Sequence, residues 1–217
     1  MDDNYPLFIF EGIDGVGKTT ASKELQKRYN RQKLFSKYYS FPGNIPGTLG
    51  DLVYKLHHNK KKYNIKSINK TSLQILHIAA HIDIIERKIE TDMYAGNLIF
   101  LDRFWWSTYV YGIYSGIERK RVRDMIKLEL YSWKKIRPAI IFLIYRKSQS
   151  FENSNARKLR LNNLSRIYIE LAKKERKKYN VIEIENNSTI EKLITEVDFH
   201  VKDWIRKNYC KFKSLNH

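Results

Sequence analysis

A glycine-rich stretch near the start of the chain carries the clearest chemistry. Residues 12–19 read Gly-Ile-Asp-Gly-Val-Gly-Lys-Thr and follow directly on the apolar run Leu7-Phe8-Ile9-Phe10. Glycines at these positions let consecutive backbone N–H groups converge on a phosphate, and the helical pattern that follows adds its positive dipole end. Lys18 can reach the outer phosphates, and the Thr19 hydroxyl can ligate Mg²⁺. The spacing therefore predicts a nucleoside triphosphate site formed by Gly12, Ile13, Asp14, Gly15, Val16, Gly17, Lys18, Thr19 and Thr20.

A second group of candidate residues closes an apolar strand in the middle of the chain. Residues 98–101 (Leu-Ile-Phe-Leu) are followed by Asp102 and Arg103. A protein with a phosphate loop places a carboxylate at such a strand end to hold the water shell of Mg²⁺. We therefore expect Thr19 and Asp102 to hold Mg²⁺, partly through water. Arg103 lies at the strand edge where open α/β sheets bind ligands, so it can bridge two anions. Simple surface ion pairing of Asp102 and Arg103 is the alternative interpretation.

The elements that must position these residues alternate along the chain. Short apolar runs predict strands at residues 7–10, 34–39, 98–101, 139–145 and 181–184. Helical patterns occupy residues 19–29, 48–57, 71–91, 105–114, 121–135, 161–178 and 189–207. This alternation predicts an α/β fold with a mostly parallel sheet and right-handed crossovers. The polar stretches 59–70 and 148–160 are expected to be solvated loops, with a lid at about residues 146–160.

Composition limits the class of protein. The chain has 217 residues, 42% of them hydrophobic, and a formal net charge of +18, which indicates one compact basic domain over residues 1–217. The single cysteine, Cys210, excludes an intramolecular disulfide framework and a cysteine-based zinc site, and fits a reducing compartment such as the cytosol. The longest apolar run, residues 138–145, is shorter than the roughly 20 residues of a membrane span. We expect a cytoplasmic protein that does not bind membranes.

Taken together, the motifs identify a family. Residues 10–20 (Phe-Glu-Gly-Ile-Asp-Gly-Val-Gly-Lys-Thr-Thr), residues 102–104 (Asp-Arg-Phe) with the polar side chains that follow, and residues 168–172 (Tyr-Ile-Glu-Leu-Ala) resemble the thymidylate kinases in order and spacing. The resemblance covers most of the chain. It implies a five-stranded parallel sheet flanked by helices, of the P-loop NTPase type with a short lid. It also implies transfer of the ATP γ-phosphoryl group to a nucleoside monophosphate.

The resemblance also implies roles for individual residues. Lys18 and Thr19 would hold ATP and Mg²⁺, Asp14 would contact the 3′-hydroxyl of the acceptor sugar, and Arg103 would clamp the acceptor phosphate against the donor. Val16 stands where some members have an arginine, which implies a transition-state arginine from the lid, with Arg157 and Arg160 as candidates. The acceptor pocket implied by the resemblance comprises Asp14, Phe41, His77, His81, Arg103, Ser107, Thr108, Tyr111 and Tyr168.

Three positions of the acceptor side depart from the family. His77 and His81 stand where the family has a phenylalanine that stacks on thymine and an arginine that bonds the base. Their spacing of four residues lays both rings on one helical face. A neutral imidazole offers one donor and one acceptor, so the pair could read the same base or select another one. Two other interpretations of the pair are core histidines whose hydrogen bonds are satisfied within the protein, and a metal site. Ser40 replaces a phosphate-binding arginine, which leaves more of that task to Arg103.

The functional prediction is an ATP-dependent nucleoside monophosphate kinase of nucleotide biosynthesis that converts deoxythymidylate to its diphosphate with Mg-ATP. One alternative is a kinase of the same fold with a different nucleotide or small-molecule acceptor. Another is a basic P-loop ATPase that binds nucleic acid, although no recognised nucleic-acid motif supports it. The resemblance implies a homodimer, for which the apolar helix at residues 73–89 could supply the interface.

Overall fold

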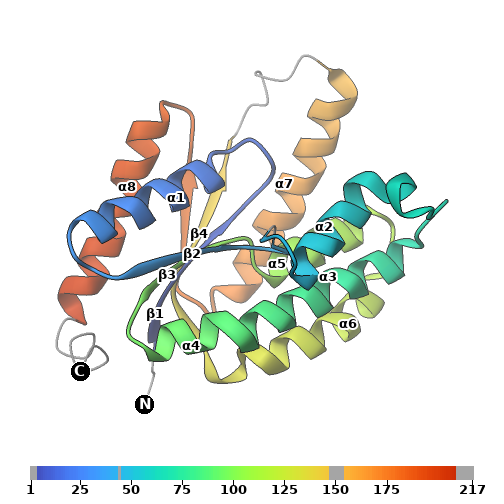
Figure 1. The fold of residues 1–217 in the computed structure, drawn as a ribbon. Helices are drawn as coiled ribbons and strands as arrows, with labels where there is room; N and C mark the ends of the chain where they lie inside the picture. Colours follow the sequence, from blue (N-terminus) through green and yellow to red (C-terminus); the bar gives the residue numbers. More distant parts are fainter. Residues whose placement is uncertain (1–3, 44, 147–153, 209–217) are drawn as a thin grey trace.

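One parallel sheet organises the molecule. The computed structural model describes residues 4–43, 45–146 and 154–208. Its strands are all parallel and lie in the order β2-β3-β1-β4-β5 (Figure 1). Their bounds are β1 Asn4–Glu11, β2 Ser36–Ser40, β3 Leu98–Asp102, β4 Arg137–Tyr145 and β5 Val181–Glu185. The predicted α/β fold with a five-stranded parallel sheet is thereby confirmed.

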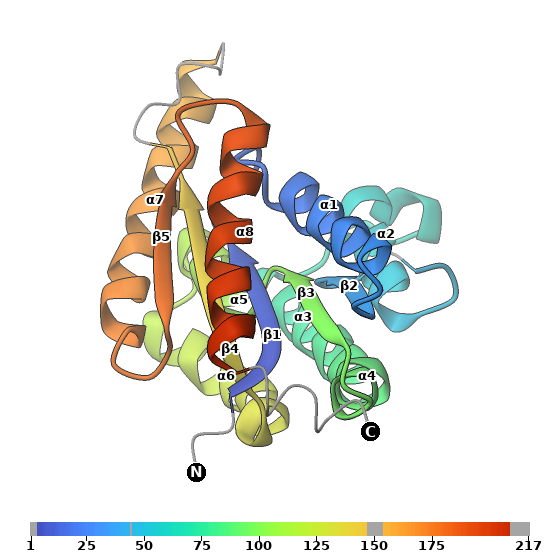
Figure 2. The same ribbon diagram turned by 90° about the vertical axis from the view of Figure 1, so that its left-hand side faces the viewer.

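Helices cover both faces of this sheet. On one face α1 (Lys18–Arg31) packs beside α8 (Ile190–Lys207). The other face carries α3 (Lys70–Ile84), α5 (Trp105–Tyr114), α6 (Arg119–Ser132) and α7 (Asn155–Glu175), as Figure 1 shows; Figure 2 looks onto the face with α1 and α8. α2 (Leu49–Asn59) lies on α3. The shorter elements are η1 Lys60–Tyr63, the π-helical turn η2 Ile85–Ile89, α4 Glu90–Tyr94 and η3 Trp133–Lys135.

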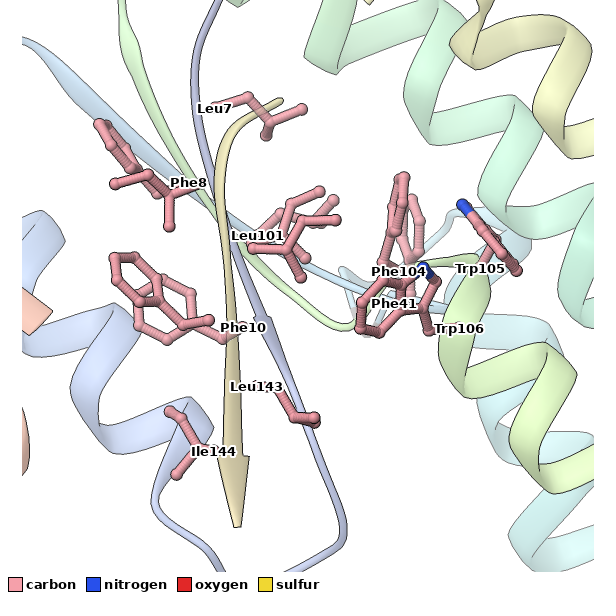
Figure 3. Close-up of a cluster of buried hydrophobic side chains, with 14 of the residues drawn as sticks. Leu7, Phe8, Phe10, Phe41, Leu101, Phe104, Trp105, Trp106, Leu143 and Ile144 are labelled. Atoms are coloured by element: carbon pink, nitrogen blue, oxygen red, sulfur yellow. The ribbon is translucent and has the colours of Figure 1, made fainter. Parts of the chain in front are cut away.

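The hydrophobic core lies on both sides of the central strands. Because successive side chains of a strand point to opposite faces, Phe8 and Phe10 of β1 point toward α1, whereas Leu7 and Leu143 point to the opposite face (Figure 3). The ring of Phe8 meets that of Trp204 in α8 at 5.5 Å between centroids. All of these strand residues are fully buried. Strands buried on both faces read as continuous apolar runs, which is why the sequence pattern located them.

Several element boundaries differ from the prediction, and two of the differences have a clear physical reason. β2 begins at Ser36 and not at residue 34, because the chain is still leaving α1: Leu34 donates its N–H to the Tyr29 carbonyl at 3.0 Å, and Phe35 is 74% exposed. α7 begins at Asn155 and not at residue 161, so residues 155–160 are helical and not loop. Arginine, lysine, alanine and leucine in this stretch are good helix formers, and an exposed first turn needs no apolar pattern. Residues 147–153 of the expected lid lie outside the described residues.

The fold brings the candidate residues to one edge of the sheet. The phosphate loop leaves the carboxyl end of β1, and Asp102 closes the neighbouring β3, which pairs with β1 from Leu7↔Ile99 to Phe10↔Asp102. The N-termini of α1 and α5 open at the same edge. Within the described ranges, no helix is both long enough and apolar enough to cross a membrane.

Candidate active site

The phosphate loop is held in a conformation that only glycine permits at its first position. Gly12 has φ +136°, and a Cβ placed there would lie 2.0 Å from the Ile144 carbonyl oxygen of β4. Gly17, with φ +98°, precedes the first residue of α1. From the end of β5, the amide of Asn186 donates a hydrogen bond to the Val16 carbonyl at 2.8 Å. The loop is therefore fixed from two neighbouring strands, with the N-terminus of α1 open behind it.

Lys18 lies buried inside the loop. Its Nζ donates a hydrogen bond to the Ile13 carbonyl at 2.6 Å. Burial, assisted by the positive charge of Arg103, lowers the pKa of Lys18 to about 8, while the carboxylates of Asp102, Asp14 and Glu11 act in the opposite direction. The Lys18 ammonium group therefore lies beside the carboxylates of the site. It can rotate to contact a phosphate when one enters the loop.

Thr19 and Asp102 meet at the mouth of the loop. The Thr19 hydroxyl donates a hydrogen bond to Oδ2 of Asp102. Asp102 is only 4% exposed, and its buried Oδ1 has no hydrogen-bond partner among the described residues. A buried carboxylate oxygen without a partner is costly unless a ligand satisfies it. Because Mg²⁺ prefers oxygen ligands, the pair fits the expected magnesium site.

Arg103 joins the phosphate loop to the next helix. Its backbone has φ 77°, a left-handed conformation that costs a non-glycine residue about 1–2 kcal/mol, and its N–H donates to the Phe10 carbonyl at 2.9 Å. The guanidinium forms an ion pair with Asp14 and donates to Ser107 Oγ at 3.0 Å. The Tyr111 hydroxyl donates to the other oxygen of Asp14 at 3.1 Å. The structure thus brings Asp14, Arg103, Ser107 and Tyr111 together.

Glu11 organises this junction, and the sequence analysis assigned it no role. The side chain is fully buried, and its Oε1 accepts hydrogen bonds from the backbone N–H groups of Phe104 at 2.7 Å and Ser107 at 3.0 Å. Its Oε2 accepts from the Ser107 hydroxyl at 2.9 Å. Burial raises the pKa of Glu11, although Arg103 and these hydrogen bonds oppose the rise. An acid that closes an apolar strand, the same signal that marked Asp102, could have identified it.

A cavity of about 450 Å³ opens beside Arg103. Its walls include eight of the nine residues predicted for the acceptor pocket: Asp14, Phe41, His77, His81, Arg103, Ser107, Thr108 and Tyr111. The remaining lining residues are Pro42, Tyr54, His57, His58, Gln74 and Arg160. Tyr168, the ninth predicted residue, is 1% exposed and lies behind the wall, where its hydroxyl is 2.8 Å from Ser107 Oγ. Ser40 at the end of β2 is not part of this lining.

The histidines predicted on one helical face lie on the same cavity wall but in different surroundings. His77 Nε2 lies 3.2 Å from Nδ1 of His57 in α2. Burial, together with the neighbouring His81, His57 and Arg103, lowers the pKa of His77 to about 3, so this ring is neutral at physiological pH. The ring of His81 stacks on Phe41, and its Nδ1 lies 2.9 Å from a carboxylate oxygen of Glu129. In the described part of the chain, no group of His, Cys, Asp and Glu side chains has the arrangement of a metal site.

The two lid candidates differ in position. Arg160 lies on the second turn of α7 and lines the cavity. Arg157 lies one turn earlier, is exposed, and is not among the lining residues of the cavity. Both therefore project from a helix and not from the solvated loop expected for residues 148–160.

Comparisons with known proteins agree with the residue pattern. Residues 10–197 match the family model of thymidylate kinase. The thymidylate kinase of Thermosipho melanesiensis is 33% identical over 141 residues, covering 64% of this chain and 65% of the relative, and that of Thermoanaerobacter sp. is 32% identical over 120 residues, covering 54% and 56%. The aligned part of the chain thus spans between about half and two thirds of these curated relatives.

The crystal structure of the thymidylate kinase from Ehrlichia chaffeensis superposes with a TM-score of 0.68 at 21% identity, over 92% of this chain and 99% of that one, and shares its fold. Because the family model covers most of the sequence, from the phosphate loop to α8, this chain belongs to the thymidylate kinase family.

Proposed function

We propose that this protein is an ATP-dependent kinase that transfers the γ-phosphoryl group to deoxythymidylate and forms its diphosphate. One observation carries the proposal: Asp14 of the phosphate loop also lines the cavity, where it is ion-paired with Arg103. A donor phosphate in the loop and an acceptor phosphate in the cavity would meet at the Arg103 guanidinium. Such positioning converts a bimolecular reaction into an effectively unimolecular one and supplies much of the catalysis.

The donor half would bind ATP through the loop backbone and Lys18. The turn from Gly12 to Gly17 would aim backbone N–H groups at the phosphates, and the α1 N-terminus would stabilise their charge. Lys18 would leave the Ile13 carbonyl and contact the outer phosphates. Thr19 and Asp102 would hold Mg²⁺, and a bound Mg²⁺ neutralises charge on the β- and γ-phosphate oxygens.

The acceptor half needs no general base, because the acceptor phosphate is already ionised. Arg103 would bind that phosphate, with its guanidinium oriented by Ser107 and Asp14. Asp14 would also face the sugar hydroxyl, and the wall formed by Phe41, His77 and His81 would face the base. Arg160 lines the same cavity, so we place it as the lid arginine that stabilises charge on the transferring phosphoryl group, with Arg157 as its neighbour on α7.

A homodimer and a cytoplasmic location complete the proposal. In α3, Ile75 is 47% exposed, and Leu73, Leu76 and Ile82 are partly exposed, which supports this helix as the interface. Light scattering at micromolar concentration is expected to give twice the chain mass of 26.0 kDa. A monomer mass at that concentration would remove the dimer from the proposal.

The test is a panel of phosphoryl acceptors. The purified protein with Mg-ATP is mixed separately with each ribo- and deoxynucleoside monophosphate, and diphosphate formation is measured with Lys18→Ala as the background. Deoxythymidylate is expected to be the best acceptor. Product from only a different monophosphate would favour a kinase of the same fold with another acceptor. The observation that supports this alternative is that His77 and His81 line the acceptor cavity. No product from any monophosphate would contradict the proposal.

A further inference from the structure

His81 is held by neighbours at one face and at one nitrogen of its ring. One face stacks on Phe41, with ring centroids 4.0 Å apart and planes inclined by 12°. Nδ1 lies 2.9 Å from Oε2 of Glu129 in α6. The residue is 2% exposed and nevertheless lines the 450 Å³ cavity. Since Nδ1 and the stacked face are occupied, Nε2 is the ring nitrogen still available to a ligand in the cavity.

Glu129 is itself fixed from a second side. It is fully buried, and its Oε1 accepts a hydrogen bond from the indole N–H of Trp133 at 3.3 Å. An ionised carboxylate only accepts hydrogen bonds, and an indole N–H only donates them. With Glu129 as the acceptor on both oxygens, the hydrogen that it shares with His81 would lie on Nδ1 of the imidazole. A ring that carries its hydrogen on Nδ1 alone has a lone pair on Nε2.

We propose that Glu129 is a positioning residue for acceptor recognition: it fixes the tautomer of His81, so that Nε2 accepts a hydrogen bond from a ring N–H of the acceptor base. The inference rests on the proposed kinase function and specifies which base chemistry the pocket selects. Thymine and uracil carry such an N–H at ring position 3, whereas cytosine carries a lone pair there. A cytosine base would bring two lone pairs together and leave Nε2 without a donor, which is unfavourable.

Replacing Glu129 by glutamine reverses the tautomer for a reason visible in the structure. The indole N–H of Trp133 needs an acceptor, so the glutamine side chain must turn its carbonyl oxygen to Trp133. Its NH₂ group then faces Nδ1 of His81 and donates to it. The imidazole hydrogen moves to Nε2, and this nitrogen of His81 becomes a donor that suits cytosine and opposes thymine.

The kinetic test compares deoxythymidylate with deoxycytidylate as acceptors. In Glu129→Gln, the ratio of kcat/KM for deoxythymidylate to that for deoxycytidylate is expected to fall by about tenfold or more, since one hydrogen bond is exchanged for a repulsive contact. Trp133→Phe alone keeps the carboxylate and is expected to keep the wild-type ratio. In the double variant Glu129→Gln, Trp133→Phe, the glutamine can turn its oxygen back to His81. This variant is expected to recover a large part of the wild-type preference for deoxythymidylate over deoxycytidylate.

A second measurement reads the tautomer itself. ¹⁵N NMR of the histidine rings, with the His81 signals assigned through His81→Gln, is expected to show hydrogen on Nδ1 in the wild type and on Nε2 in Glu129→Gln. A wild type with hydrogen on Nε2, or on both nitrogens at neutral pH, overturns the inference even if the variant fails to fold. Equal losses for both acceptors in a folded variant overturn it as well. A wild type inactive on every monophosphate overturns the proposed function and this inference with it, whereas an active wild type with an unchanged ratio in the variant overturns the inference alone.

Discussion

The donor half and the acceptor half of the site are built in different ways. The phosphate loop is eight consecutive residues whose function lies largely in the backbone, and its shape follows from local glycine conformations such as that of Gly12. The acceptor cavity collects side chains from the β2 end, α2, α3, α5 and α7. The comparison teaches that the proposed donor chemistry is tied to one short segment, whereas the proposed base recognition would depend on single side chains such as His81.

The largest effect is expected from the donor half. Lys18→Ala removes the buried cation that would contact the outer phosphates. Loss of such a charge typically costs several kcal/mol at the barrier, so kcat should fall by about 10³-fold. The fall in kcat is measured as the rate of diphosphate formation at saturating concentrations of both substrates. Arg31→Ala, at the exposed far end of the same helix, is expected to stay near wild type. Turnover of Lys18→Ala within about threefold of wild type would contradict the donor assignment.

A variant of Arg103 tests whether the donor half and the acceptor half of the site contribute independently to catalysis. Arg103→Ala removes the guanidinium that pairs with Asp14 and Ser107. We expect kcat/KM for the acceptor to fall by about 10²-fold, because a charge-assisted contact is lost, while the KM for ATP changes by less than about threefold. Initial rates over both substrate concentrations distinguish the two. Arg87→Ala, an exposed pair with Asp83, serves as control. Equal effects on both substrates would show that the comparison fails.

Glu11 connects the two halves and should show a smaller effect. Glu11→Gln replaces a carboxylate that accepts hydrogen bonds from Phe104 and Ser107 by an amide with one accepting oxygen. The expected loss is about tenfold in kcat together with about 1–3 kcal/mol of stability, since a buried partner is left unsatisfied. Chemical denaturation and acceptor kinetics measure the two effects. Glu170→Gln, whose carboxylate is half exposed and pairs with Arg119, should change neither. Wild-type kinetics in Glu11→Gln would limit its role to folding.

The smallest effect concerns stability in the acceptor half. The pKa of His77 is about 3 in the folded protein and ordinarily 6.5, so the unfolded chain takes up a proton between pH 6.5 and 3 that the folded chain does not. Stability should therefore fall as the pH falls through this window, by at most about 1.4 kcal/mol per pH unit. His77→Gln should remove this contribution, so denaturation at pH 7 and pH 5 should show a smaller loss in the variant than in wild type. Equal losses would contradict the environment described for His77.

Much of this architecture could be predicted because it is encoded locally. The central strands are continuous apolar runs, and residues 12–19 specify their own conformation through glycines and the helix that follows. Asp102 was identified because an acid closing a parallel strand must lie at the edge where the loop opens. The start of α7 was missed because an exposed, basic helical turn has no apolar pattern to mark it.

The sequence by itself determined the family and the sheet and predicted the donor chemistry, because these depend on short-range patterns and on backbone conformation. Only the tertiary structure decided which surroundings each side chain acquired. Glu11 meets Ser107 across 96 positions of the chain, and Glu129 meets His81 across 48. A further long-range contact, from Tyr168 to Ser107, holds Tyr168 behind the pocket wall. Burial and hydrogen-bond partners set the tautomer, charge and orientation of a side chain, and residues distant in the sequence supply both.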